Sequence, residues 1–240
     1  MKYFSLAAIC GLALFVTGCH LGSKVPPMSV RPKVVLTFDD GFVEHYTTVA
    51  PILEKYGLRG TFNIIVGRVG KPGYMNWRQI RSLAKRGHAI ENHTYSHTNL
   101  VALVKSGSQK DFAHELEFSC DKIAAEVGRR PTFLCYPYSQ STWVTDQLVR
   151  DYWLSPMDCK RRNFGEGTVP RTETGAGAYI NACIADHVEP IDILTHGVTA
   201  TGGGWRPFPN AEAFEEHIKE IREMQDQGKI AVVLYRDAVR

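Results

Sequence analysis

The stretch VVLTFDDG, residues 34–41, joins five mostly apolar residues to two adjacent carboxylates and a glycine. A short apolar run of this kind is typical of a strand buried on both faces of a parallel sheet. Asp39 and Asp40 then lie at the carboxyl end of that strand, the edge where barrel enzymes place their chemistry. Taken alone, the two residues could equally be a helix cap and a turn.

A second polar cluster, HTYSH at residues 93–97, follows another short apolar stretch. Residues 89–92 predict a strand after a turn, so His93 and His97 also come just after a strand. By itself, such a histidine pair is common and could be two solvated side chains. Together with the acidic pair, it predicts a divalent metal site with one aspartate and two histidines as ligands. The other aspartate is then free to act as a general base.

The composition is compatible with one globular enzyme domain. The chain has 240 residues, of which 44% are hydrophobic and 22% charged, and this is enough for a sizeable core. The formal net charge is only +3 and the charges are scattered, so the sequence does not indicate a nucleic-acid partner.

Residues 1–19 have the features of a secretory signal, with Lys2 near the start and a mostly apolar run that is too short to span a bilayer. VTGC at 16–19 resembles the lipobox of bacterial lipoproteins, which implies cleavage before Cys19 and acylation of its thiol. An ordinary signal peptide cut nearby is the alternative. Residues 20–32 are expected to be a tether, and 33–240 the catalytic domain. We therefore expect an exported protein, lipid-anchored to the cell envelope at the periplasm or cell surface.

Four cysteines remain outside this leader and tether: Cys120, Cys135, Cys159 and Cys183. An oxidising compartment allows disulfides, but the spacing selects no pairing and no zinc ribbon. Buried thiols are the favoured interpretation.

Apolar stretches alternate with amphipathic ones along the rest of the chain, which predicts parallel strands joined by helices. Strands are expected at 34–38, 61–66, 89–92, 132–136, 153–157, 191–195 and 230–235. Helices are expected at 46–56, 77–86, 109–127, 142–152 and 211–227. This pattern favours an α/β fold, a distorted (β/α) barrel of about seven units, over an open sheet.

Two further motifs follow predicted strands, YPY at 136–138 and LTHG at 194–197. Hydrolysis of an amide needs a proton delivered to a poor leaving nitrogen, and a histidine with a pKa near neutrality can deliver it. His196 is therefore a candidate general acid. For an isolated LTHG motif, however, a core or capping histidine is the favoured interpretation.

The motifs at 37–41 and 93–97, with weaker matches at 136–138 and 194–196, together resemble those of the polysaccharide deacetylases. This family is carbohydrate esterase family four, with the nodulation-type deacetylase homology domain. The resemblance covers about residues 33–240 and implies a distorted barrel of β/α units. It also implies an acetylated glycan as substrate.

The resemblance implies roles for individual residues. Three would bind a divalent metal, usually zinc: Asp40, His93 and His97. Asp39 would be the general base and His196 the general acid. The backbone N–H of Tyr138 would hold the oxyanion together with the metal, and Leu194 would line the pocket for the acetyl methyl group.

The chain departs from the family pattern in two places. The family commonly has an arginine two residues before the proline of its Pro-Tyr pair, where it orients the base, and this chain has Cys135 there. Arg161 and Arg162 are candidate replacements, although two solvated arginines are an equally good interpretation. The family's Asp and Trp motif, which supports the acid histidine, is not recognisable either.

Two classes of function remain open. The first is a metal-dependent hydrolase that removes N-acetyl groups from a glycan, with O-acetyl removal, as from xylan, as a variant. The second is a non-catalytic glycan-binding lipoprotein. The presence of Asp39 favours the enzyme, because metal binding alone gives no reason for a base beside the ligands. Trp205, after three glycines, is a candidate for contact with a sugar ring, and simple packing is the alternative.

Overall fold

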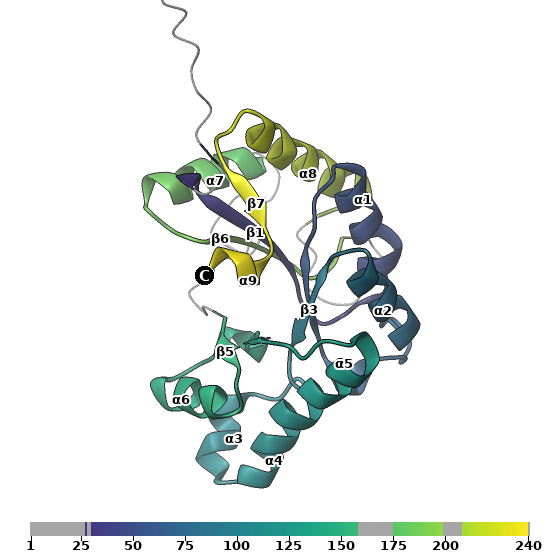
Figure 1. Ribbon diagram of the computed structural model, residues 1–240, viewed down its shortest axis with the longest axis vertical. Helices are drawn as coiled ribbons and strands as arrows, with labels where there is room; N and C mark the ends of the chain where they lie inside the picture. Colours follow the sequence, from purple (N-terminus) through teal and green to yellow (C-terminus); the bar gives the residue numbers. More distant parts are fainter. Residues whose placement is uncertain (1–26, 28–29, 158–174, 199–207, 240) are drawn as a thin grey trace, which may run out of the picture.

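The structure is a computed structural model that describes residues 27, 30–157, 175–198 and 208–239 of the chain. One curled sheet of seven parallel strands lies at its centre, with helices around it (Figure 1). The strands are β1 Lys33–Phe38, β2 Thr61–Ile64, β3 Ala89–Asn92, β4 Phe133–Leu134, β5 Ser155–Pro156, β6 Ile191–Thr195 and β7 Ala231–Val233. Their order is β5-β4-β3-β2-β1-β6, and β7 also pairs with β1. The predicted distorted barrel of parallel β/α units is therefore confirmed.

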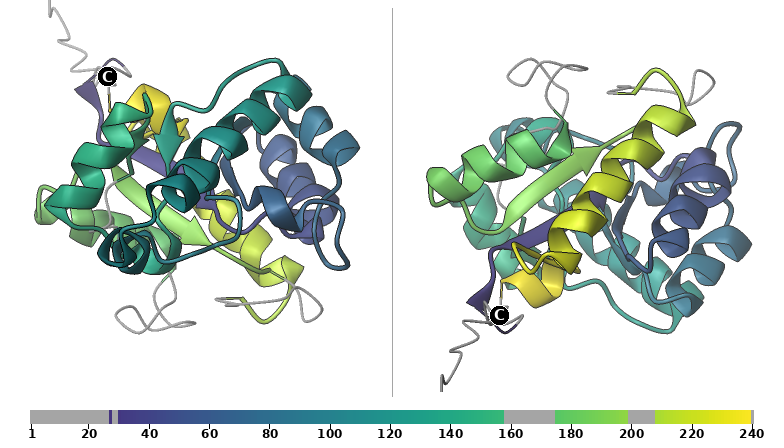
Figure 2. Two further views of the ribbon diagram at one scale, coloured as in Figure 1. Left: turned by 90° about the horizontal axis from the view of Figure 1, so that it is seen from below. Right: turned by 90° about the horizontal axis from the view of Figure 1, so that it is seen from above.

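Helices alternate with the strands along the chain, as β/α units require. They are α1 Ala50–Lys55, α2 Trp77–Lys85, α3 Leu100–Ser106, α4 Gln109–Ala113, α5 Ser119–Val127, α6 Trp143–Asp151, α7 Ala176–Ala185, α8 Ala211–Asp226 and α9 Tyr235–Ala238. Figure 2 shows α7 and α8 beside β6, and the two helices contact each other. In the part of the chain that the structure describes, no helix is both long and apolar enough to cross a bilayer.

Three of these helices, α3, α7 and α9, are absent from the sequence prediction. Helix α3 has ordinary boundary signals. The Asn99 side chain accepts hydrogen bonds from the backbone N–H groups of Val101 and Ala102, and Gly107 ends the helix at φ +75°. Helix α7 is rich in alanine and has little polar face, so it lacks the amphipathic period that marks a surface helix.

Several predicted elements are divided differently in the structure. The helix expected at 46–56 begins as a π-helical turn at His45–Val49 and continues as α1, and the strand expected at 61–66 ends at Ile64. The helix expected at 109–127 consists of α4, a π-helical turn at His114–Phe118, and α5. The strand expected at 230–235 ends at Val233, because Tyr235 already begins α9 and packs its ring against Phe133. Tertiary packing therefore overrides the strand propensity of the tyrosine.

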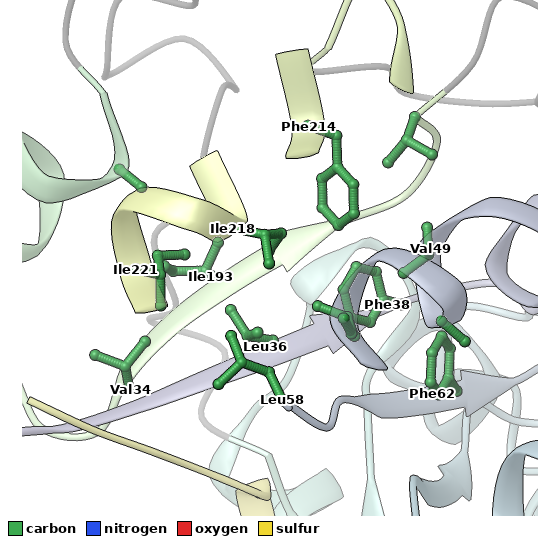
Figure 3. Close-up of a cluster of buried hydrophobic side chains, with 14 of the residues drawn as sticks. Val34, Leu36, Phe38, Val49, Leu58, Phe62, Ile193, Phe214, Ile218 and Ile221 are labelled. Atoms are coloured by element: carbon green, nitrogen blue, oxygen red, sulfur yellow. The ribbon is translucent and has the colours of Figure 1, made fainter. Parts of the chain in front are cut away.

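The main core lies between β1, β6 and α8. Val34, Leu36 and Phe38 project from alternate positions of β1 into this core, toward Ile193 of β6 and Ile218 of α8 (Figure 3). The strand is also buried on its other face, as the continuous apolar run predicts for a central parallel strand. This burial anchors β1, so the residues that follow Phe38 leave the sheet at a defined position.

The described cysteines agree with the expectation of buried thiols. Cys120, Cys135 and Cys183 are all buried, and no two of these three are joined by a disulfide. Cys159 lies outside the described residues.

Candidate metal centre

The carboxyl ends of the central strands bring the two polar motifs together. In the parallel pairing, Phe38 lies opposite Thr195 of β6 and Phe62 of β2, so β1, β2 and β6 end at the same edge. Strand β3 pairs with β2 on its other side and ends at Asn92, immediately before His93. The aspartate pair and the histidine motif therefore leave the sheet at one edge, as the sequence predicts.

Asp40, His93 and His97 converge there on a common point. The Nε2 atoms of His93 and His97 lie 3.5 Å and 3.4 Å from Oδ1 of Asp40. These distances exceed the usual N–H···O hydrogen bond of about 2.7–3.2 Å. Ligand atoms that are each about 2.0–2.2 Å from a tetrahedral zinc ion lie about 3.3–3.5 Å apart, so the spacing suits ligands that share an ion.

The surroundings of these side chains also fit a metal. Oδ1 of Asp40 is buried and has no hydrogen-bond partner among the described residues, which is costly unless a cation faces it. The Nδ1 of His93 lies 2.8 Å from the backbone oxygen of Cys135 and donates to it, so Nε2 is the nitrogen that faces Asp40. A carbonyl partner of this kind fixes the ring of a metal-binding histidine.

Three pKa shifts set the protonation of this cluster. Burial by itself would raise the pKa of Asp40, but the contact with His93 and the charge of His196 hold it below its usual value. Burial and the charge of His93 lower the pKa of His97 to about 4. At neutral pH Asp40 is therefore ionised and His97 is neutral. Burial by itself would lower the pKa of His93, but the charges of Cys135 and Asp39 and the contact with Asp40 raise it well above its usual value, so a metal ion would displace a proton from His93 on binding.

The backbone at the candidate ligands is held in an uncommon conformation. Asp40 and His97 have φ values of +78° and +67°, in the left-handed region that most residues avoid. Gly41 follows Asp40 at φ +80°, where a Cβ atom would approach Ile64 to 3.3 Å. Such conformations persist only where the surroundings enforce them, and they cluster at functional sites.

A buried carboxylate from a neighbouring helix holds the histidine loop. Glu115, in the turn between α4 and α5, accepts from the backbone N–H groups of Tyr95 and Ser96, each at 2.8 Å. Its other oxygen accepts from the Ser96 hydroxyl at 2.6 Å. The sequence analysis missed Glu115, because nothing local links it to a loop 19 residues away.

The carboxylate of Asp39 lies beside His93 and contacts the side chains of Asn63 and Cys135. The amide of Asn63, in β2, donates to Oδ1 of Asp39 at 2.5 Å, and the thiol of Cys135 lies 3.2 Å from Oδ2. Asn63 was also missed, although a polar residue within the otherwise apolar stretch of β2 is a signal that could have found it. Asp39 therefore lies beside the three candidate ligands with its carboxylate already oriented.

Of the remaining predicted site residues, three lie in the described part of the chain and four lie outside it. His196 directly follows β6, which ends at the same edge of the sheet as β1. Leu194 is buried in β6. The ring of Tyr138 is centred 4.8 Å from that of His97 and is 62% exposed. Four predicted residues lie outside the described part of the chain: Cys19, Arg161, Arg162 and Trp205.

His45, which the sequence analysis also missed, supports the position of His196. Its Nε2 donates to the backbone oxygen of His196 at 2.6 Å, and its ring lies among those of Phe38, Phe42 and Phe62. Burial lowers the pKa of His45 to about 4, against the opposing effect of this hydrogen bond.

This shift predicts a loss of stability in acid. Between about pH 6.5 and pH 4 the unfolded chain protonates His45 and the folded chain does not, so protons favour unfolding. We expect His45 to lower the free energy of unfolding by about 3 kcal/mol across this range. Urea unfolding of the chelator-treated protein at several pH values measures it. The variant His45→Gln, whose amide can still donate, should show a smaller pH dependence. If the free energy of unfolding depends on pH equally in the wild type and in His45→Gln, His45 is not the source of the pH dependence.

Comparisons with known proteins indicate the family to which the chain belongs. The chain is 32% identical over 186 residues to a chitin deacetylase of Arthroderma benhamiae, covering 72% of this chain and 48% of the relative. It is 30% identical over 138 residues to a peptidoglycan-N-acetylglucosamine deacetylase of Bacillus cereus, covering 54% and 47%. The chain thus spans about half the length of these curated relatives.

A solved structure and a family comparison extend this similarity. The Bc1960 peptidoglycan N-acetylglucosamine deacetylase has the same fold, with a TM-score of 0.64 at 20% identity, covering 88% of this chain and 89% of that one. The sequence model of the polysaccharide deacetylases matches residues 29–155, more than half of the chain, and this range contains the acidic pair and both histidines. The protein therefore belongs to the polysaccharide deacetylase family.

Proposed function

We propose that this protein is a metal-dependent hydrolase that removes N-acetyl groups from a polysaccharide or oligosaccharide. The observation that carries the proposal is the convergence of Asp40, His93 and His97, with the oriented carboxylate of Asp39 beside them. Family membership and the names of the relatives, a chitin deacetylase and a peptidoglycan-N-acetylglucosamine deacetylase, support the same reaction.

Asp40, His93 and His97 would hold the metal ion. Two imidazoles and one carboxylate suit zinc, which is the ion we propose. When bound, such an ion polarises an acetyl carbonyl and lowers the pKa of a water molecule.

The chain's own residues supply the proton transfers. Asp39 accepts the proton of the attacking water, for which its buried, oriented carboxylate is suited. His196 donates a proton to the leaving amine nitrogen, so that free amine and acetate are released. The backbone N–H of Tyr138 donates to the oxygen that becomes negative, and Leu194 contacts the acetyl methyl group.

Acetate release tests the proposal. The purified full chain with zinc is incubated with N-acetylglucosamine oligomers and, separately, with acetylated xylan. Release from the oligomers supports amide hydrolysis, whereas release from xylan alone would replace it by ester hydrolysis at the same site. Absence of release from any acetylated glycan, with metal bound, would favour the non-catalytic glycan-binding alternative.

We also propose that the protein is exported and lipid-anchored to the cell envelope. Support comes from the sequence of residues 1–19, in which the apolar run is followed by VTGC and Cys19 is the acylation site. Labelling of bacterial cells with a palmitate analogue tests this. The label should follow the protein and disappear in Cys19→Ala; equal labelling of both would contradict the assignment.

Two exposed aromatic side chains are suited to contact a sugar chain. Tyr138 lies beside His97, and Trp143, which is 75% exposed, begins α6 on the same edge of the sheet. Because an exposed aromatic ring can stack on the apolar face of a sugar, we expect Trp143→Ala to raise KM for long oligomers about 10-fold with little change in kcat.

The chain offers a matched control for this prediction. Trp153 is 86% exposed but follows the other end of α6, near the opposite edge of the sheet. Trp153→Ala should leave KM unchanged. An equal effect of both substitutions, or an effect on short and long oligomers alike, would argue against an extended sugar contact at Trp143.

A further inference from the structure

Among the described residues, two side chains from different parts of the sheet donate to different oxygens of Asp39. Asn63 donates from β2 to Oδ1, and Cys135 donates from the residue after β4 to Oδ2. All three side chains are buried. Two contacts to the two oxygens fix both the position of the carboxylate and its rotation.

Cys135 also contacts the metal-binding loop through its backbone. Its N–H donates to the carbonyl of Asn92 at 2.9 Å, and its own carbonyl accepts from Nδ1 of His93 at 2.8 Å. One residue thereby sets the orientation of a candidate ligand through its main chain and of Asp39 through its side chain. Any shift of Cys135 would move both groups together.

We infer that Asn63 and Cys135 are positioning residues for Asp39, and Cys135 stands at the position where related sequences commonly have an arginine. This inference rests on the proposed function, in which Asp39 accepts a proton from water. Both donors are uncharged, so neither stabilises the ionised form of the carboxylate as strongly as a guanidinium would. Positioning matters because a misplacement of about 1 Å can cost about 100-fold in rate.

The thiol of Cys135 has a second possible role, as a metal ligand, which an experiment must distinguish from positioning. Ligand atoms of Asp39, His93 and Cys135 all lie within 4.8 Å of one another, so the thiol could instead bind the metal. Against this, Asp40, His93 and His97 already provide three ligands without the cysteine. A cobalt-substituted protein distinguishes the roles, because a cysteine ligand produces a strong sulfur-to-cobalt absorption band in the near ultraviolet. We expect no such band, and its presence would overturn the inference.

Kinetics of matched variants test the positioning role. Cys135→Ala removes the donor and should lower kcat about 10-fold while KM and zinc affinity stay unchanged. Cys135→Ser restores a donor and should recover most of the loss, which a purely structural role would not explain. Asn63→Leu, which keeps a similar volume without the amide, should also lower kcat. Unchanged kcat in both donor-less variants, or a loss confined to KM or zinc affinity, would overturn the inference.

Cys120→Ala is the matched control. Cys120 is equally buried and has its sulfur 3.1 Å from an amide nitrogen, that of Asn92, but it does not contact Asp39. This variant should retain wild-type kcat. Circular dichroism and thermal unfolding establish that each variant is folded.

Crystal structures separate a failure of this inference from a failure of the proposed function. If the wild-type chain releases no acetate, the proposed function fails, but the orientation of Asp39 can still be compared between wild type and the double variant Cys135→Ala, Asn63→Leu. A carboxylate that turns away in the double variant supports the positioning role. A carboxylate that keeps its wild-type position overturns it.

Discussion

Replacing Asp40 by asparagine is expected to lower the affinity for zinc by about 100-fold or more, because the cluster loses the anionic member of its three ligands. Asparagine is the suitable replacement, since Asp40 has a φ of +78° and asparagine tolerates this region better than alanine. At limiting zinc, acetate release should fall in proportion. Competition with a zinc-binding dye measures the affinity, and thermal unfolding shows whether the variant is folded.

A second buried carboxylate provides the control for this experiment. Asp192, in β6, accepts from the Thr37 hydroxyl at 2.7 Å, and Asp192→Asn keeps an oxygen for this contact while removing the charge. This variant should bind zinc as the wild type does. If Asp40→Asn also keeps one tightly bound zinc per chain, Asp40 is not a ligand and the proposed metal centre is wrong.

Replacing Asp39 by asparagine is expected to lower the activity without lowering the affinity for zinc. We expect kcat to fall by roughly a thousandfold, because the amide cannot accept the proton of the attacking water. Zinc affinity should be unchanged, since the three ligands remain. The side-chain oxygen of the variant can still accept from Asn63, so the local structure should survive.

The ratio of acetate release to bound zinc distinguishes the two aspartates. Asp39→Asn should lose activity at full zinc occupancy, whereas Asp40→Asn should lose both together. If Asp39→Asn loses zinc as well as activity, Asp39 is a ligand, as in the alternative set with His93 and Cys135. If it retains wild-type kcat, another group accepts the proton and the proposed mechanism fails.

Local sequence signals were sufficient for the sheet and for the location of the candidate site. The apolar runs at 34–38, 89–92 and 191–195 predicted β1, β3 and β6 to within one residue. Because the carboxyl ends of parallel strands meet at one edge, the polar residues after these runs had to lie near one another. Helix α7 escaped prediction for a physical reason, since its exposed face carries mostly alanine and therefore shows almost no polar period.

The contacts that orient the site could not be predicted in the same way. Asn63 reaches Asp39 across adjacent strands, Cys135 reaches it across 96 residues, and Glu115 holds a loop of a different unit.

The sequence by itself therefore determined the family pattern, which predicted strands the motifs follow, and which residue types were available for metal and proton chemistry. Only the tertiary structure decided which side chains hold Asp39 and the histidine loop, because a hydrogen bond between distant segments depends on strand register and side-chain direction, and neither leaves a periodic signal in the chain.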